Sequence, residues 1–252
     1  MTTILRLGKQ QRRQAYIFAL LMTAWCFMAG TAAAQTRYYV TPTGLVPTGM
    51  DNAWTDVIKL ETALEKAEPG DEIWVQGFEE IRKNSVDYRQ VYLAPKEGWT
   101  LKAGVKLYGG FKGNETSLEQ RATLGKAYNF ACRSILSGDI SMNDTIDHVN
   151  LISSSNALRA DNAEHVLTMN LDNSGSNNVN DAVSVLDGFT IVGGHASENG
   201  GGVLVKGHRE FSCAYRIERC FFFNNYAVQN GGAIYVDAYA GKPTANESYI
   251  NQ

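Results

Sequence analysis

The heptapeptide NGGGVLV at residues 199–205 returns as NGGAIYV at residues 230–236, an offset of 31 residues with no gap. Residue class is kept along the preceding apolar run at the same offset, in the pairs Leu186–Ile217, Asp187–Glu218 and Ile191–Phe222. Self-similarity at a fixed period of this size is the sequence signature of repeat architectures. We therefore interpret the C-terminal part of the chain as structural repeats that follow one another at this spacing.

A parallel β-solenoid satisfies this pattern. One such unit cannot enclose a core, but stacked units can, with strands about 4.8 Å apart in the hydrogen-bonding direction. Because side chains alternate across a strand, Val203 and Val205 are predicted to face the core and Leu204 to face outward. Residues 234–236 repeat this pattern in the next unit, with only Tyr235 facing outward. The Asn and Gly residues before each strand suit sharp turns.

The N-terminal part of the chain has a different pattern. Apolar residues recur at three-to-four spacing between residues 54 and 67, which predicts one amphipathic helix of about 14 residues. Residues 38–41 and 71–75 on either side are predicted strands. From residue 101 to residue 252, short β-branched or aromatic runs alternate with Gly and Asn, and no further helical pattern is present. We therefore expect an N-terminal α/β cap over residues 35–100 and an all-β body after it.

The first 34 residues have the layout of a secretory signal peptide. Basic residues precede an apolar run at residues 15–29, and the small residues Ala32–Ala34 follow it. The run is shorter than the ~20 apolar residues that a membrane span needs. We expect cleavage after Ala34, export of the mature chain, and no transmembrane helix within it.

The mature chain is acidic and has an odd number of cysteines. Removal of residues 1–34 leaves 19 basic against 26 acidic residues, a formal charge of −7. An acidic exported chain without a basic cluster is a poor candidate for nucleic-acid binding. Three cysteines remain, Cys132, Cys213 and Cys220. A Cys213–Cys220 disulfide and buried free thiols are both compatible with this arrangement.

Several segments resemble known exported proteins. LDGFTIVGGHASENGGGVLV, residues 186–205, resembles the coils of right-handed parallel β-helix proteins that Bacteroidetes and related bacteria export. Residues 221–236 resemble the repeat of chlamydial polymorphic outer-membrane proteins, because Phe-x-x-Asn is followed by Gly-Gly-Ala-Ile. LYGGFKGNETSLEQR at residues 107–121 looks like the first coil of the same exported proteins.

The resemblance implies a right-handed parallel β-helix, a pectate-lyase-like solenoid, outside the cell or on the outer-membrane surface of a Gram-negative bacterium. Proteins of this kind usually carry more coils, so the resemblance also implies that the β-helix is incomplete at its C-terminus. In this chain Val75 continues as QGFEEIR where the relatives have Gly-Thr-Tyr, so we expect an irregular first coil.

Two acidic groups are candidate sites. Asp187 and Glu218 are expected to stack one repeat apart, either as an acid–base pair or cation site, or as a turn position that prefers an acidic residue. Asp139, Asp144 and Asp147 cluster in SGDISMNDTIDH, where they could hold calcium or line a solvated turn. The polygalacturonase motifs Asn-Thr-Asp, Asp-Asp and Gly-His-Gly are missing from the sequence. Catalysis is therefore not the function that we expect, and calcium is the one cofactor that stays open.

Aromatic side chains are the remaining functional candidates. Phe221, Phe223, Tyr226 and Tyr235 are predicted to face outward or to lie at a corner, where a ring can stack on a sugar or dock a partner. Covering loops or further coils are the alternative explanation. We expect a non-catalytic, adhesin-like protein that contacts a surface glycan or a host or cell-surface protein. The alternatives are a polysaccharide lyase or glycoside hydrolase acting on acidic polysaccharide, and a truncated fragment without independent function.

Overall fold

The computed structural model describes residues 35–46, 54–79, 91–124, 126, 130–144, 158–171, 183–207, 214–237 and 248–251. It divides the chain after Ala34 into two units, and all described residues belong to the second. The predicted signal peptide, Asp147 and Cys213 lie outside the described residues.

Parallel sheets make up most of the regular secondary structure in the described residues. The first sheet has the order β18 (Ser248–Asn251), β14 (Tyr215–Glu218), β10 (Ser184–Asp187), β7 (Lys106–Phe111), β3 (Glu72–Gln76), β1 (Arg37–Val40) and β2 (Val57–Ile58). The second has the order β15 (Phe221–Phe223), β11 (Phe189–Val192), β8 (Cys132–Ser137) and β4 (Phe78–Glu79), with β5 (Val91–Leu93) also paired to β8. The third has the order β17 (Ile234–Asp237), β13 (Val203–Lys206), β9 (Leu167–Asn170) and β6 (Trp99–Lys102).

Helices are few in the described residues. They are α2 (Leu60–Lys66) and the short 3-10 helices η2 (Leu118–Gln120) and η3 (Leu158–Asp161). A short strand pair, β12 (His195–Ala196) with β16 (Tyr226–Ala227), completes the assignment. Among the described strands only β4 and β8 pair antiparallel. The all-β class with parallel sheets is therefore confirmed. No helix in the described part of the chain is long and apolar enough to cross a membrane.

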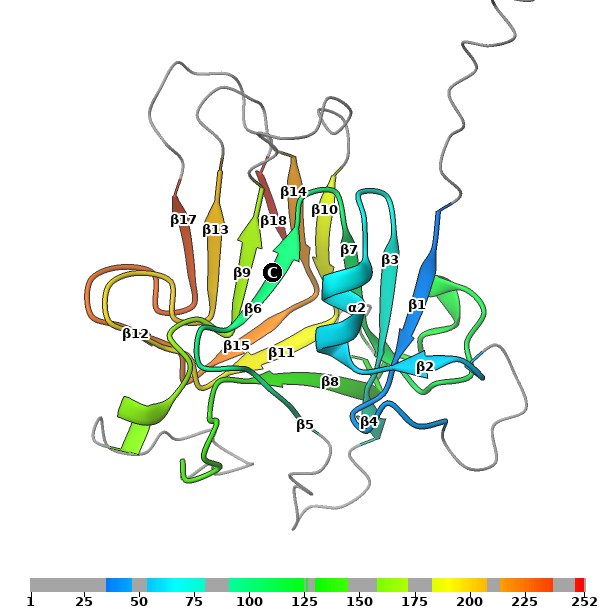
Figure 1. The fold of residues 1–252 in the computed structure, drawn as a ribbon, viewed down its shortest axis with the longest axis horizontal. Helices are drawn as coiled ribbons and strands as arrows, with labels where there is room; N and C mark the ends of the chain where they lie inside the picture. The colour runs from blue at the N-terminus through cyan, green and yellow to red at the C-terminus, as the bar shows by residue number, and fades with distance from the viewer. Residues whose placement is uncertain are drawn as a thin grey trace, which may run out of the picture. The chain divides into compact units, whose positions relative to one another are not determined.

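From β10 onward the chain visits the sheets in a fixed order (Figure 1). It runs through β10, β11, β12 and β13, which we call the inner circuit. It then runs through β14, β15, β16 and β17, which we call the outer circuit. Each strand of the outer circuit pairs in parallel with its counterpart in the inner circuit. Consecutive circuits therefore lie side by side in every sheet.

The register between the two circuits has the offset found in the sequence. Cα partners include Leu186–Ile217, Ile191–Phe222 and Val203–Ile234, and an isolated bridge joins Asn199 to Asn230. The predicted pairing of these residues is confirmed. It also places Asp187 beside Glu218, as expected.

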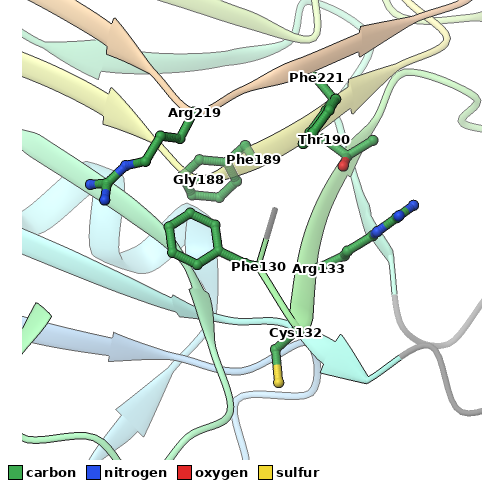
Figure 2. A pocket seen from close by; sticks show the side chains of 8 residues that line it. All are labelled: Phe130, Cys132, Arg133, Gly188, Phe189, Thr190, Arg219 and Phe221. Atoms are coloured by element: carbon green, nitrogen blue, oxygen red, sulfur yellow. The ribbon is translucent and has the colours of Figure 1, made fainter. Parts of the chain in front are cut away.

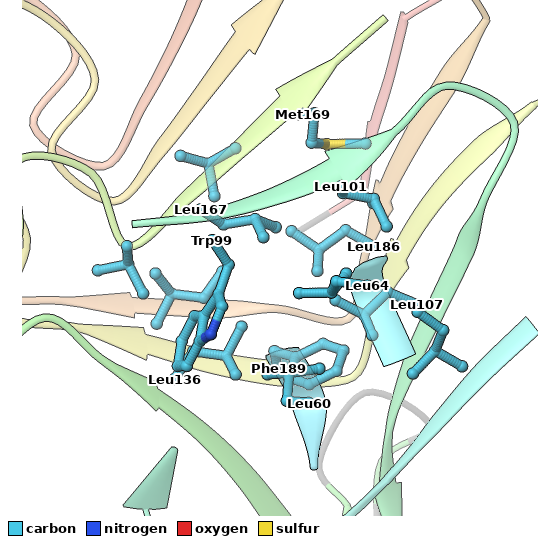
Figure 3. Packing of buried hydrophobic residues seen from close by; sticks show 14 of the residues in the cluster. Leu60, Leu64, Trp99, Leu101, Leu107, Leu136, Leu167, Met169, Leu186 and Phe189 are labelled. Atoms are coloured by element: carbon cyan, nitrogen blue, oxygen red, sulfur yellow. The ribbon is translucent and has the colours of Figure 1, made fainter. Parts of the chain in front are cut away.

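One apolar core lies between the three sheets (Figure 3). Leu107 and Leu186 enter it from the first sheet, Leu136 from the second, and Leu101 and Met169 from the third, all without solvent exposure. Side chains from all three sheets therefore shield one another from water in a shared core.

The exposure of individual side chains confirms the predicted core position of some residues and corrects that of others. Val203 and Val205 are buried in the core, as predicted. Leu204, which was predicted to face outward, does not belong to the core cluster but is buried all the same, with 8% exposure. The glycine turn before β13 covers it: a Cβ added to Gly200 would lie 3.1 Å from the Cβ of Leu204. Val236 was expected in the core but is 37% exposed, because it lies on the edge strand β17.

The predicted N-terminal cap contains both expected strands, as β1 and β3, but its helix is shorter than predicted. Helix α2 has 7 residues. Val57 and Ile58 form β2 instead, because they pair with the edge of β1. Trp54 packs in a second apolar cluster and its indole N–H donates to the carbonyl of Glu115 at 3.0 Å. The register of β3 against β7 shifts between Trp74 and Gln76, at the place where the first coil was expected to be irregular.

Candidate functional site

Asp187 and Glu218 are adjacent in the first sheet but do not act as a pair. The carboxylate of Asp187 is 1% exposed and accepts hydrogen bonds from two guanidinium groups. Arg219 donates from Nε to Oδ1 at 2.7 Å and from Nη2 to Oδ2, and Arg121 donates from Nη2 to Oδ2 at 3.0 Å. Glu218 forms a separate ion pair with Arg216 at 3.6 Å. The oxygens of Asp187 are therefore occupied by protein cations.

The two arginines were not identified from the sequence. Arg121 has a side chain that is 2% exposed, and its Nη1 donates to the carbonyl of Gly109 at 3.0 Å. The ring centroid of Phe130 lies 4.7 Å from the Arg121 guanidinium carbon and 5.3 Å from that of Arg219. Arg219 adopts a left-handed backbone conformation, with φ at 52°. A non-glycine residue in this region signals a position held by its surroundings, here by the bidentate bond to Asp187.

A shallow depression with a volume of about 10 Å³ lies beside this cluster (Figure 2). That is roughly the room that one water molecule needs, far less than a typical ligand site offers. Phe130, Gly188, Phe189 and Phe221 are among its lining residues. Arg133 and Arg219 also line it, but Figure 2 shows their side chains extending in opposite directions. Two guanidinium groups that diverge in this way do not make one anion site.

The aspartate cluster stabilises a turn. Asp139 accepts hydrogen bonds from the backbone N–H groups of Asn143 at 3.1 Å and Asp144 at 3.2 Å. Asp144 accepts one from the side-chain amide of Asn162 at 2.8 Å. Burial raises the pKa of Asp139, and the hydrogen bond from Asn143 opposes this shift. Within the described residues, no three His, Cys, Asp or Glu side chains come together as metal ligands.

The outward positions of β15 carry two parallel aromatic rings. Phe222 packs against the core, so its neighbours Phe221 and Phe223 face the other side of the strand. Their ring centroids are 6.1 Å apart and their planes differ by 7°. Both side chains are half-buried. The structure thus brings together two of the four aromatic residues that were predicted to form a binding surface.

The other two aromatic candidates lie on other strands. Tyr226 is on β16, and its ring centroid is 5.1 Å from that of His195. Tyr235 is on β17, in register with Leu204 of β13. Both are half-buried. Neither belongs to the ring pair of β15.

Cys220 is a thiol enclosed by backbone. Its Sγ lies 3.2 Å from the carbonyl oxygen of Glu218 and 3.7 Å from that of Leu186. Burial raises the pKa of this thiol to about 12. Of the two alternatives in the sequence, the free thiol describes Cys220, which is a half-buried residue, and Cys132 is a buried cysteine.

Arg121 and Phe130 had no local signal that could have identified them. Arg121 is 66 residues from Asp187 in the sequence, and no motif links the two. Arg219 follows Glu218 directly, so the stacked acidic position at 187 and 218 was the available hint that a cation belongs nearby. Comparison of the chain with models of protein families, with curated proteins and with solved structures gave no match.

Proposed function

We propose that residues 101–252 form the coils of a right-handed parallel β-helix and that residues 35–100 form its N-terminal cap. Parallel pairing of each outer strand with its inner counterpart supports this architecture. An amide contact supports it too, because Asn230 Nδ2 donates to Asn199 Oδ1 at 3.0 Å from one circuit to the next. Connections between parallel strands of one sheet are right-handed in about 98% of cases. The hand of the coil follows from that preference.

We further propose that this β-helix is an exported, non-catalytic surface protein that contacts glycans or cell-surface partners. The observation that carries the proposal is the parallel ring pair of Phe221 and Phe223 on the outward side of β15. The face of an aromatic ring packs well against the apolar C–H face of a sugar ring. Export to the outer surface of a Gram-negative bacterium rests on the signal-peptide pattern and on the resemblance.

The arginine contacts of Asp187 favour a binding protein over a hydrolase. A general acid or base needs a carboxylate that can reach the substrate. The Asp187 carboxylate is buried and held by Arg121 and Arg219. Glu218 alone then lacks the second carboxylate that glycoside hydrolysis uses.

A glycan-binding measurement tests the proposal. Purified protein is applied to an array of bacterial and host surface glycans, and affinities for the best ligands are measured by calorimetry. The variant Phe221→Ala/Phe223→Ala is expected to bind at least about tenfold more weakly, since loss of a stacking ring removes ~1.4 kcal/mol or more. Tyr235→Ala, on another strand, is the matched control and keeps wild-type affinity.

Two results contradict the proposal. One is equal glycan affinity of the wild type and the double variant. The other is turnover: incubation with uronate polysaccharides that yields new reducing ends or unsaturated products, abolished by Glu218→Gln, establishes the lyase or hydrolase alternative instead.

A further inference from the structure

The edge strand β17 presents an incompletely covered part of the core. Leu101, Met169, Val205 and Val236 are consecutive partners across the third sheet. The first three are 0%, 0% and 1% exposed, but Val236 is 37% exposed. All four occupy the core-facing side of their strands. The higher exposure of Val236 therefore comes from the place of its strand in the sheet. β17 is the last strand in the order of this sheet.

A second column of the same sheet behaves in the same way. Trp99, Leu167 and Val203 are buried, whereas their partner Ile234 is only half-buried at the edge of the core. Ile234 and Val236 together form an apolar patch on β17, beyond which the described residues place no further strand of this sheet. An edge of this kind is a template for one more strand.

The opposite edge of the third sheet is covered by the protein itself. Helix α2 contacts β6, the other edge strand, and Leu60, Ala63 and Leu64 pack from it into the core. Figure 1 shows α2 beside β6, far from β17. In the described part of the chain, this sheet thus has one edge covered by α2 and one edge, β17, with no strand beyond it, so a second copy cannot continue the sheet from the β6 side.

Charge indicates which strand fits the open edge. On its inner side Asp237 is in register with Lys206 of β13, and both residues are exposed. Residues 233–237 contain no basic residue, so another β17 offers no cation to Asp237. A strand with two aliphatic residues at alternate positions and a basic residue after them matches Ile234, Val236 and Asp237.

We propose that β17 binds an extended segment of another polypeptide as an additional parallel strand, with aliphatic side chains over Ile234 and Val236 and a basic side chain beside Asp237. Main-chain hydrogen bonds give affinity in such a complex, and the alternate side chains give specificity. The sequence NGGGVLVK of residues 199–206 has the required pattern, because β13 makes this same register with the inner side of β17. The site is separate from the ring pair of β15, so either proposal can fail without the other.

The test uses the capped synthetic peptide NGGGVLVK and the purified protein. We expect saturable binding in a calorimetric or NMR titration, and slower hydrogen exchange of the β17 amides in the complex. The peptide variant Val205→Asp, which changes a core-facing position, is expected to bind at least about tenfold more weakly. The peptide variant Leu204→Asp carries the same added charge on the outward side and is expected to lose less than about threefold.

The protein offers the same matched pair. Val236→Asp is expected to abolish peptide binding, whereas Tyr235→Asp retains it, and circular dichroism checks that both variants are folded. Replacing the peptide lysine by glutamate is expected to weaken binding at low ionic strength and to matter less at high salt, because the pair with Asp237 is exposed.

Three outcomes overturn the proposal. One is the lack of saturable peptide binding, and another is an equal effect of Val236→Asp and Tyr235→Asp. The third is a dimer in sedimentation experiments that Val236→Asp dissociates and that the peptide does not displace, which assigns the edge to a second copy of the chain.

Discussion

Removal of the Asp187 carboxylate is expected to be among the most destabilising polar substitutions in this protein. Asp187→Asn keeps the size of the side chain and removes its charge. Arg219 has a side chain that is 34% exposed and can turn toward solvent, but Arg121 is 2% exposed and loses the carboxylate that neutralises it. Breaking a buried ion pair by removing one partner costs about 3–5 kcal/mol. We expect a loss of this size in the free energy of unfolding.

The neighbouring acidic residue provides the matched control. Glu218 is the Cα partner of Asp187, but its pair with Arg216 is 3.6 Å long and has side chains that are 23% and 44% exposed. Such pairs contribute about 0–1 kcal/mol. Glu218→Gln is therefore expected to change stability little, although it alters the same charge on the adjacent strand.

Urea unfolding followed by tryptophan fluorescence and by circular dichroism measures both variants. The midpoint of Asp187→Asn is expected to fall strongly with an unchanged slope, whereas that of Glu218→Gln stays near wild type. Adding Arg121→Met to Asp187→Asn is expected to restore part of the loss, because the unpaired buried cation is removed. Equal midpoints for Asp187→Asn and Glu218→Gln would refute the assignment of Asp187 to a buried charge cluster.

Three further outcomes are expected from the geometry. Gly201→Ala places a Cβ 2.1 Å from the carbonyl oxygen of Tyr226 and is expected to lower the free energy of unfolding by about 1–3 kcal/mol in thermal unfolding. Gly207→Ala, whose Cβ would lie 3.4 Å from the Asp237 carbonyl oxygen as its nearest neighbour among the described residues, is expected to stay within about 0.5 kcal/mol of wild type. Cys220, whose pKa burial raises to about 12, is expected to resist iodoacetamide at pH 8 in the folded protein and to react after denaturation, as peptide mapping by mass spectrometry can show. Burial raises the pKa of Asp139, so protonation of this side chain stabilises the folded protein. This stabilisation is complete below the unfolded pKa of about 3.9 and is lost as the pH rises through the folded pKa. Asp139→Asn is expected to flatten the dependence of stability on pH in that window, measured as urea midpoints at several pH values.

The sequence predicts the stacking of the circuits well because the stacking depends on local spacing. Ile191 pairs with Phe222 and Val203 with Ile234 in the register that a single offset defines. The sequence cannot predict the true length of the cap helix in the same way. Trp54 and Val57 fit a helical period, yet they are buried in a cluster outside α2. Trp54 packs against Phe111, which the sheet brings close although the two residues are distant in the chain.

In the candidate site, strand alternation could be predicted from the sequence, but the partners of the charged residues could not. Alternation along β15 correctly divides Phe222, which packs on the core, from Phe221 and Phe223 on the other side. No such rule reveals that Asp187 meets Arg121, because the two residues are 66 positions apart and only the fold of the intervening chain brings them together. An acidic residue at a repeated position can serve a binding or catalytic site, or it can have a structural role. The positions of the surrounding cations distinguish the two. Because two guanidinium groups hold the Asp187 carboxylate, it neutralises buried positive charge, and the proposed ligand contact rests on Phe221 and Phe223.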